Sequence, residues 1–269
     1  MSHVSAARIG RFELSPICEG WAPIALADEC PGQQVDWGGE RARFPWAFAD
    51  EVSWAWHVHS FVVTGPSGVV LVDTGLGSFP PYTPWGETVA DAWSGIDASQ
   101  VRHVVLTHLH ADHSGGIVDG SGEPRFPHAT YHLHPGDRTA FARADDAEEY
   151  VARSAMETVE AAGMLDLTEP DHDILPGISV RHTPGHTPGH RSVLVRDGGA
   201  TLLITGDVVH LPVQVANPSW ASAHDEDPGL GQAARQVLLW RARHDAWRVA
   251  IPHFAHPFGR VVEGGWEPD

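Results

Sequence analysis

The ten residues THLHADHSGG, from Thr107 to Gly116, constrain this chain more than any other stretch. They follow the apolar run VRHVVL, which is typical of a buried strand, and they hold three histidines and an aspartate without lysine or arginine. Side chains alternate in an extended segment, so His108 and His110 share one side. Asp112 and His113 face a second point if the chain turns into a helix there. The spacing predicts two centres of ligation from one loop, which indicates a dinuclear metal site rather than an exposed polar loop.

Further ligand-type residues follow other apolar runs, where open α/β sheets collect chemistry. The segments HTPGHTPGH, LLITGDVVH and VAIPHFAH supply His182, His186, His190, Asp207, His210 and His253. Taken singly, each is typical of a structural residue, but together with the first motif they supply enough ligands for two metals. Gly115 and Gly116 permit either a close backbone approach or a positive φ beside the site.

The amino-acid composition argues against some classes of binding partner. The 269 residues hold 17 basic and 35 acidic side chains, a formal net charge of −18, which argues against nucleic acid and against anionic membrane surfaces. No run reaches the roughly 18 apolar residues of a membrane span, and the first residues lack the apolar core of a signal peptide. We therefore expect a cytoplasmic protein. Cys18 and Cys30 fit no metal spacing by themselves, and we expect two thiols.

The periodicity predicts an α/β fold in which strands dominate both halves and each half carries a helix. HSFVVTGPSGVVLVDTG is typical of a hairpin around GPSG, and short apolar runs predict strands at ATYHLH, ISVRHT, RSVLVRD, ATLLITGD and RVAIPH. We expect one helix from about Asp137 to Gly163, and a second at 230–247. The buried face predicted for the second helix consists of Leu230, Ala234, Val237 and Leu238. The first 50 residues predict irregular structure around a few short strands.

The order of these motifs between His59 and His253 resembles the metallo-β-lactamase superfamily. The matching segments are LVDTG (71–75), THLHADHSGG, HTPGHTPGH, TGD (205–207) and PH (252–253). The resemblance implies a four-layer αβ/βα sandwich with the site at one edge between two sheets. We expect residues 1–269 to form a single domain of this type, with residues 1–55 as an N-terminal extension and candidate cap over the site.

The resemblance also implies the ligands. The first metal would be held by His108, His110 and His186, the second by Asp112, His113 and His253, and both by Asp207. Asp73 in the LVDTG loop would orient the metal loop through hydrogen bonds without ligating. His182 and His190 match positions that are more often structural. The other histidines carry no motif and are expected at the surface or in hydrogen-bonded core positions: His3, His57, His103, His128, His132, His134, His172, His224 and His244.

Five imidazoles and two carboxylates suit two Zn²⁺ ions, with Mn, Fe or Co as alternatives. Two metals would share a hydroxide and make it nucleophilic at neutral pH, and Asp112 and Asp207 are candidates to carry its proton. The chain also resembles the branch of acyl-homoserine lactonases and methyl-parathion hydrolases. In those lactonases a tyrosine lies three residues after the bridging aspartate, whereas this chain has His210, a third candidate catalytic residue.

The resemblance therefore implies a dinuclear zinc hydrolase that opens a small hydrophobic lactone or ester. Aromatic side chains in the irregular segments suit a lid over an apolar acyl chain. The candidate substrate contacts are Trp37, Trp46, Phe48 and Trp85, while Trp54 and Trp56 are expected in the core. Three alternatives remain open: a phosphotriester hydrolase, a β-lactam hydrolase and a di-iron redox protein. A homodimer is a further expectation from the resemblance.

Overall fold

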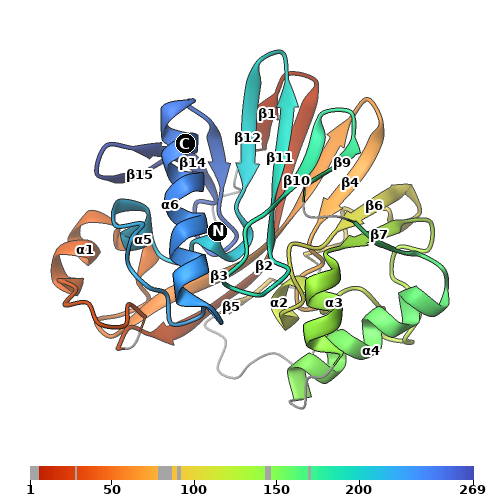
Figure 1. The fold of residues 1–269 in the computed structure, drawn as a ribbon, viewed down its shortest axis with the longest axis horizontal. Coiled ribbons are helices and arrows are strands. Elements are labelled where there is room, and N and C mark those ends of the chain that lie inside the picture. The colour runs from red at the N-terminus through yellow and green to blue at the C-terminus, as the bar shows by residue number, and fades with distance from the viewer. Residues whose placement is uncertain (1–5, 28, 78–86, 90–91, 143–146, 169–170) are drawn as a thin grey trace.

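The computed structural model describes residues 6–27, 29–77, 87–89, 92–142, 147–168 and 171–269. Two mixed β-sheets lie against each other, and helices cover their outer faces (Figure 1). Within these residues the first sheet has the order β1-β2-β3-β4-β6-β7-β8, with β5 paired to β2. Its strands are β1 (Ala7–Ile9), β2 (Phe12–Ala25), β3 (Ser53–Gly65), β4 (Gly68–Val72), β5 (Glu87–Thr88), β6 (Val101–Val105), β7 (Thr130–Leu133) and β8 (Leu165–Leu167).

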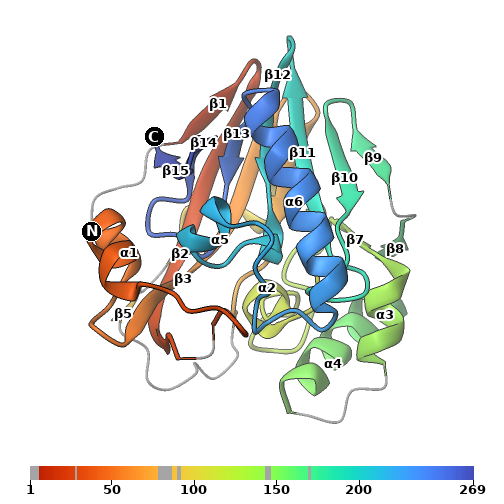
Figure 2. The same ribbon diagram turned by 60° about the vertical axis from the view of Figure 1, so that its left-hand side comes forward.

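The second sheet has the order β15-β14-β13-β12-β11-β10-β9 in the described residues. Its strands are β9 (His172–Leu175), β10 (Ile178–His182), β11 (Arg191–Asp197), β12 (Ala200–Ile204), β13 (Arg248–Ala250), β14 (Phe258–Val262) and β15 (Gly265–Pro268). The α-helices are α1 (Trp37–Arg43), α2 (Ala111–Ser114), α3 (Pro135–Phe141), α4 (Ala147–Ala161), α5 (Pro212–Ala216) and α6 (Pro228–His244). Figure 2 shows α6 lying along the outer face of the second sheet, with α3 and α4 beside the first. None of these described helices is long and apolar enough to cross a membrane.

Side chains along each strand point alternately to the two faces of the sheet, and this alternation forms the separate hydrophobic cores. In β4, Val70 and Val72 point into the core between the two sheets, whereas Leu71 points outward to the core under α4. In β11, Val193 and Val195 likewise face the other sheet, and Leu194 packs in the core under α6. Strands that are buried on both faces read as continuous apolar runs. Three cores between four layers confirm the predicted αβ/βα sandwich.

Three predicted elements differ from the structure. The N-terminal region was expected to be irregular, but β2 runs for 14 residues and pairs with β3 from Glu13 to Ala25. The helix expected from Asp137 to Gly163 appears as α3 and α4, with residues 143–146 outside the described part. The predicted face of α6 is correct for Leu238, which is buried, but wrong for Leu230 and Val237, which are 50% and 68% exposed. Arg235 is fully buried in their place.

Candidate metal centre

Five segments bring ligand-type residues to one edge of the sandwich. Asp73 follows β4, the THLHADHSGG loop follows β6, and Asp207 and His253 follow the parallel neighbours β12 and β13. His186 lies in the turn between β10 and β11. Because parallel strands place their carboxyl ends at one edge, residues more than 100 positions apart converge there.

The metal loop is folded tightly against the loop after β4. A Cβ atom added to Gly115 would lie 2.2 Å from the carbonyl oxygen of Leu76, and one added to Gly116 would lie 2.2 Å from that of Thr74. Gly115 has a φ of −62°, so close approach rather than a positive φ requires glycine there. This packing fixes α2, whose first turn carries Asp112 and His113.

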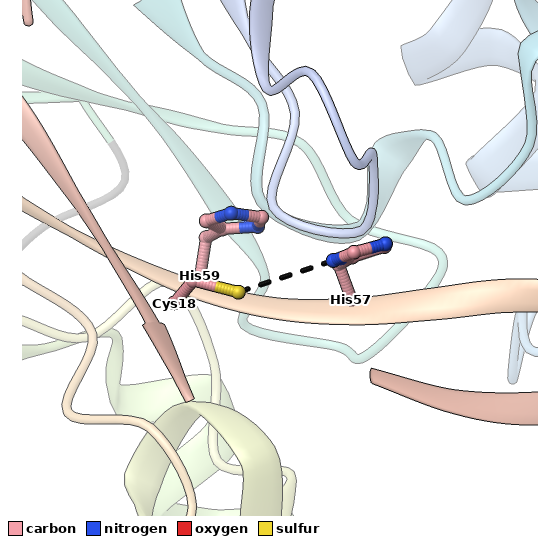
Figure 3. Close-up of side chains that lie close together, drawn as sticks. All are labelled: Cys18, His57 and His59. Atoms are coloured by element: carbon pink, nitrogen blue, oxygen red, sulfur yellow. Dashed lines mark hydrogen bonds between the residues drawn. The ribbon is translucent and has the colours of Figure 1, made fainter. Parts of the chain in front are cut away.

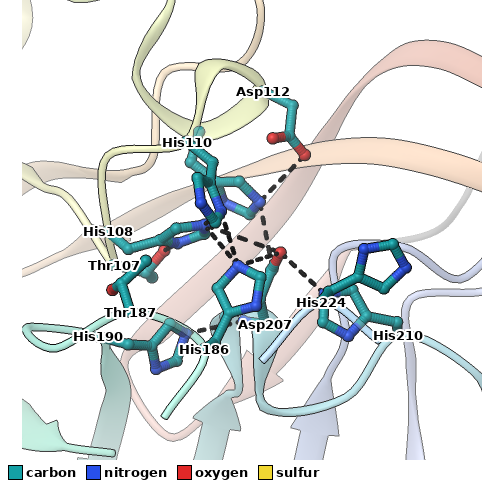
Figure 4. Close-up of polar contacts among 12 residues, drawn as sticks. Thr107, His108, His110, Asp112, His186, Thr187, His190, Asp207, His210 and His224 are labelled. Carbon is teal, nitrogen blue, oxygen red and sulfur yellow. Dashed lines mark hydrogen bonds and ion pairs between the residues drawn. The ribbon is translucent and has the colours of Figure 1, made fainter. Parts of the chain in front are cut away.

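The first group of converging atoms consists of three imidazole nitrogens. His108 Nε2 lies 3.0 Å from His110 Nδ1 and 3.1 Å from His186 Nε2, and the latter two are 2.8 Å apart. Figure 4 shows these rings turned toward one another. Nitrogens bound to one tetrahedral Zn²⁺ at about 2.0–2.1 Å lie roughly 3.3 Å apart. Burial holds the pKa of His108 and of His186 well below the ordinary value, so both are neutral, the form that ligates.

The second group joins one imidazole from α2 to two carboxylates and a second imidazole. His113 Nε2 lies 3.2 Å from Asp112 Oδ2 and 3.1 Å from Asp207 Oδ1. His253 Nε2 lies 3.0 Å from Asp207 Oδ2. Within the described part of the chain, Asp112 Oδ2 and His113 Nε2 are buried and make no hydrogen bond. Buried polar atoms are seldom left without a hydrogen bond, so this facing pair fits ligands of a common cation.

Asp207 belongs to both groups. Its Oδ2 atom lies 3.4 Å from His186 Nε2 and 3.8 Å from His108 Nε2, and its carboxylate also meets the second group. Burial raises the pKa of Asp207, but the charges of His113 and His253 outweigh it and hold the pKa well below the ordinary value. The residues present therefore fit a dinuclear centre with a shared carboxylate, and the assignment of each ligand remains a prediction.

Asp73 supports the centre from behind. Its carboxylate accepts hydrogen bonds from the Thr107 N–H at 2.7 Å, the Thr107 hydroxyl at 2.9 Å and His113 Nδ1 at 2.8 Å. The last bond places the proton of His113 on Nδ1 and leaves Nε2 for a metal. Asp73 is 1% exposed and has a φ of +61°, a conformation in which Asp and Asn are enriched among non-glycine residues.

The two histidines set aside as structural lie outside both groups. His190 Nε2 accepts a hydrogen bond from the Asp207 N–H at 2.8 Å, and His190 Nδ1 lies 3.0 Å from the Thr183 carbonyl oxygen. His182 donates to the Pro188 carbonyl oxygen and stacks on His134 with the ring centres 4.3 Å apart. His190 thus positions the backbone of Asp207.

A cavity of about 310 Å³ lies over the two groups. Its lining consists of Ile24, Trp54, Trp56, His110, Ala111, Asp112, His186, Asp207, His210 and His224. Trp54 and Trp56 belong to an apolar core cluster, as expected, and they also form an apolar wall of the cavity. The structure does not bring Trp37, Trp46 and Phe48 into this lining. Trp37 and Phe48 pack behind Trp54 in an apolar cluster, Trp46 lies against Phe254, and Trp85 is outside the described residues.

His210 and His224 form one side of the cavity. His210 Nε2 lies 3.2 Å from Asp207 Oδ2, and the His210 ring lies 4.8 Å from that of His224 (Figure 4). His224 Nε2 lies 3.0 Å from Oε2 of Glu29, which is 3% exposed. No sequence signal marks His224 or Glu29 as part of the site, since 195 residues separate them and neither stands in a motif.

A family comparison agrees with this geometry. Residues 54–253 match the model of the metallo-beta-lactamase superfamily. The match covers well over half of the chain, and it includes every segment of the two groups. The chain belongs to the metallo-beta-lactamase superfamily.

Curated relatives are lactonases at modest identity. An N-acyl homoserine lactonase of Bacillus sp is 25% identical over 142 residues, covering 52% of this chain and 52% of the relative. The N-acyl homoserine lactonase AttM of Rhizobium radiobacter is 29% identical over 175 residues, covering 56% of this chain and 64% of the relative. The matches thus span about half to two thirds of the length of these relatives.

Solved structures share the fold over nearly the whole chain. AidC, described as a dizinc quorum-quenching lactonase in complex with a product, superimposes with a TM-score of 0.85 at 18% identity, covering 98% of this chain and 97% of AidC. The hydrolase AbOPH superimposes with a TM-score of 0.82 at 22% identity, covering 100% of this chain and 98% of AbOPH. At these identities the likeness establishes the fold.

Proposed function

We propose that this chain is a dinuclear zinc hydrolase that opens a lactone ring, with an acyl-homoserine lactone or another hydrophobic lactone or ester as substrate. The observation that carries the proposal is the pair of ligand groups that share Asp207 beneath a cavity of about 310 Å³. The names of the curated relatives support the substrate class, because they are N-acyl homoserine lactonases.

Zinc is the proposed metal because five imidazoles and two carboxylates form a borderline donor set. When bound, two zinc ions polarise the scissile carbonyl and lower the pKa of water toward neutrality. The chain's own residues handle the protons. Asp112 lines the cavity, and its carboxylate oxygen that is not bound to metal can accept the proton of the attacking water.

His210 is the proposed partner of the departing oxygen. It lines the cavity beside Asp207, and its Nδ1 atom is buried without a hydrogen-bond partner among the described residues. One ring nitrogen therefore faces Asp207 while the other remains for the substrate. A neutral imidazole carries one proton, and with Nε2 facing the Asp207 carboxylate the Nδ1 atom is an acceptor. Once a proton released by the attacking water reaches Nδ1, His210 can give that proton to the departing alkoxide.

The cavity wall favours an apolar group attached to the lactone. Ile24, Trp54 and Trp56 are the large apolar side chains of the lining, and its titratable side chains are all histidines and aspartates. Burial of methylene groups against such a wall contributes about 0.8 kcal/mol for each group. Binding should therefore strengthen with acyl length until the cavity is filled.

The test is proton release by zinc-loaded protein in a weakly buffered indicator solution. The substrates are acyl-homoserine lactones of short and long acyl chain, an unsubstituted lactone, a phosphotriester and a β-lactam. We expect ring opening of acylated lactones, with kcat/KM rising with acyl length, and none in His108→Ala. Turnover of the phosphotriester or β-lactam alone would overturn the lactone assignment. In a separate elemental analysis of protein purified without added metal, two iron ions per chain together with no hydrolysis would favour the redox alternative. The homodimer remains a prediction, and light scattering would test it by measuring the molar mass in solution.

A further inference from the structure

A third group of ligand-type side chains lies outside the dinuclear centre. Cys18 on β2 faces His57 and His59 on β3, and one ligand atom from each residue lies within 4.8 Å of the other two. The Cys18 Sγ to His57 Nδ1 distance is 3.9 Å (Figure 3). Neither the metallo-β-lactamase motifs nor the predicted dinuclear centre includes any of these residues.

Strand pairing creates this group. His57 and His59 share one face of β3, and Cys18 is the register partner of His59 on β2. The register shifts between Cys18 and Gly20, which places Trp21 opposite His57. A bulge of this kind redirects side chains locally, so the shift sets how the thiol of Cys18 meets the two imidazoles.

The group lies partly within the protein, with His59 buried and Cys18 and His57 half-buried. His59 is 3% exposed, and its ring stacks on Phe61, which packs against Phe258 in the core between the sheets. His59 Nδ1 lies 2.7 Å from the Pro252 carbonyl oxygen, an acceptor, so Nδ1 carries the proton. Nε2 of His59 then holds the lone pair that a metal would use.

We propose that Cys18, His57 and His59 form a third metal site, which binds one thiophilic divalent cation such as Zn²⁺. A thiolate with two imidazoles suits zinc, and three protein ligands leave a fourth position for water. Ligand atoms around a tetrahedral zinc lie about 3.3–3.6 Å apart, so small rotations of the Cys18 and imidazole side chains close the observed separations. On binding, Cys18 releases its thiol proton to solvent and the sulfur donates its electron pair to the cation.

The site lies directly behind the segment that carries His253. The His57 carbonyl oxygen accepts a hydrogen bond from His253 Nδ1 at 2.7 Å, and the His59 ring donates to Pro252. A cation on His57 and His59 would therefore stiffen the strand that anchors one predicted ligand of the dinuclear centre. The cavity lining contains none of the three residues, so the cation would act on the dinuclear centre only through this strand.

Cobalt titration of the metal-free protein tests the proposal. A cysteine thiolate bound to Co²⁺ gives a near-ultraviolet charge-transfer band, and the two groups around Asp207 contain no cysteine, so the band reports on a thiolate site alone. We expect the band in the wild type, its loss in Cys18→Ser and its retention in Cys30→Ser, whose thiol lies in the apolar cluster beside Trp54. His57→Gln should weaken the cobalt affinity reported by the band by about tenfold or more.

The absence of a charge-transfer band in wild type at excess cobalt would overturn the site, as would a band that persists in Cys18→Ser. These results are independent of the proposed function. Wild type that shows the band but opens no lactone would overturn the hydrolase assignment and leave the third site in place.

Discussion

Single residues that are not ligands hold the ligands of this centre in position. Asp73 accepts three hydrogen bonds from the metal loop, and His190 binds the backbone N–H of Asp207. Contacts of this kind fix the tautomer and the ring orientation of a ligating histidine. The geometry of the centre is therefore sensitive to changes one contact away from any metal.

Asp73→Asn should weaken zinc binding by about 10- to 100-fold. Asparagine keeps the shape and tolerates the φ of +61°, but it has one acceptor oxygen in place of two for Thr107 and His113. Competition against a chromophoric chelator measures the affinity. Asp119→Asn, at an exposed carboxylate that caps a surface turn, is the matched control and should bind as wild type. Equal affinity for the two variants would contradict the role of Asp73.

His210→Phe should lower kcat for lactone opening by about 10²–10³-fold while both zinc ions stay bound. Phenylalanine keeps the ring in the cavity wall and removes both nitrogens, one of which lies 3.2 Å from Asp207 Oδ2. Steady-state kinetics combined with elemental analysis separates loss of the proton donor from loss of metal. Unchanged kcat in a fully metallated variant would rule out the proposed role of His210.

Among the elements, α6 contacts the site through the buried guanidinium of Arg235. Arg235 donates to the carbonyl oxygens of Val208 and Trp220, at 2.6 and 2.7 Å, and to Asp225 Oδ2 at 2.8 Å. Val208 follows Asp207 directly. The helix thus holds the segment of the shared carboxylate through one guanidinium, and this explains why the helix turns Arg235 rather than Val237 inward.

Arg235→Met should lower the free energy of unfolding by about 3–5 kcal/mol, because it leaves Asp225 buried without its partner. Urea unfolding followed by circular dichroism measures the change. Arg241→Met on the exposed side of the same helix is the control and should differ by less than about 0.5 kcal/mol. If both variants unfold at the same urea concentration, the Arg235 contacts do not stabilise the fold.

Sequence patterns predicted the elements whose signals are local. The hairpin of β3 and β4 and the strands β10, β11, β12 and β13 have short apolar runs between turns, so they were predicted correctly, whereas β9, β14 and β15 were not predicted. β2 was not predicted as a long strand, because Pro16 and Pro23 argue against a strand. They are tolerated because β1 pairs only with residues 12–14 and β5 only with residues 20–21, so among the described residues both prolines face an edge without a partner strand.

The residues of the candidate site also divide into those that sequence motifs predict and those that they do not. The ligand-type residues lie in short motifs at strand ends, and the family resemblance of these motifs predicted that the residues meet. His224 with Glu29, and Cys18 with His57, meet only through tertiary packing, and no spacing in the sequence predicts either pair. The buried face of α6 could not be predicted, because its partner Asp225 is in a loop before the helix.

At the scale of the whole molecule, buried histidines make the fold sensitive to acid. Burial lowers the pKa of His59 and of His132 to about 4. The unfolded chain binds protons at these side chains near pH 6.5, so the stabilisation is present above that pH and is lost as the pH falls toward 4. Asp137 opposes this trend, because burial raises its pKa to about 7.

His132→Gln should therefore flatten the pH dependence of stability. Because His132 stays neutral in the folded protein, the free energy of unfolding falls by up to about 2 kcal/mol between pH 7 and pH 5. Glutamine does not titrate, so the variant lacks this change. Urea unfolding of the metal-free protein at pH 7.5 and at pH 5 measures the difference. His128→Gln, at an exposed position, is the control and should keep the wild-type slope. A His132→Gln slope equal to that of wild type would contradict the assignment.

Two metal ions should lie on either side of the Asp207 carboxylate. Anomalous X-ray diffraction at the zinc edge from crystals of zinc-loaded protein would locate them. We expect two peaks about 3.5–4 Å apart. One should lie among the nitrogens of His108, His110 and His186, and the other among Asp112, His113 and His253. A single peak, or two peaks that do not share Asp207, would contradict the dinuclear centre.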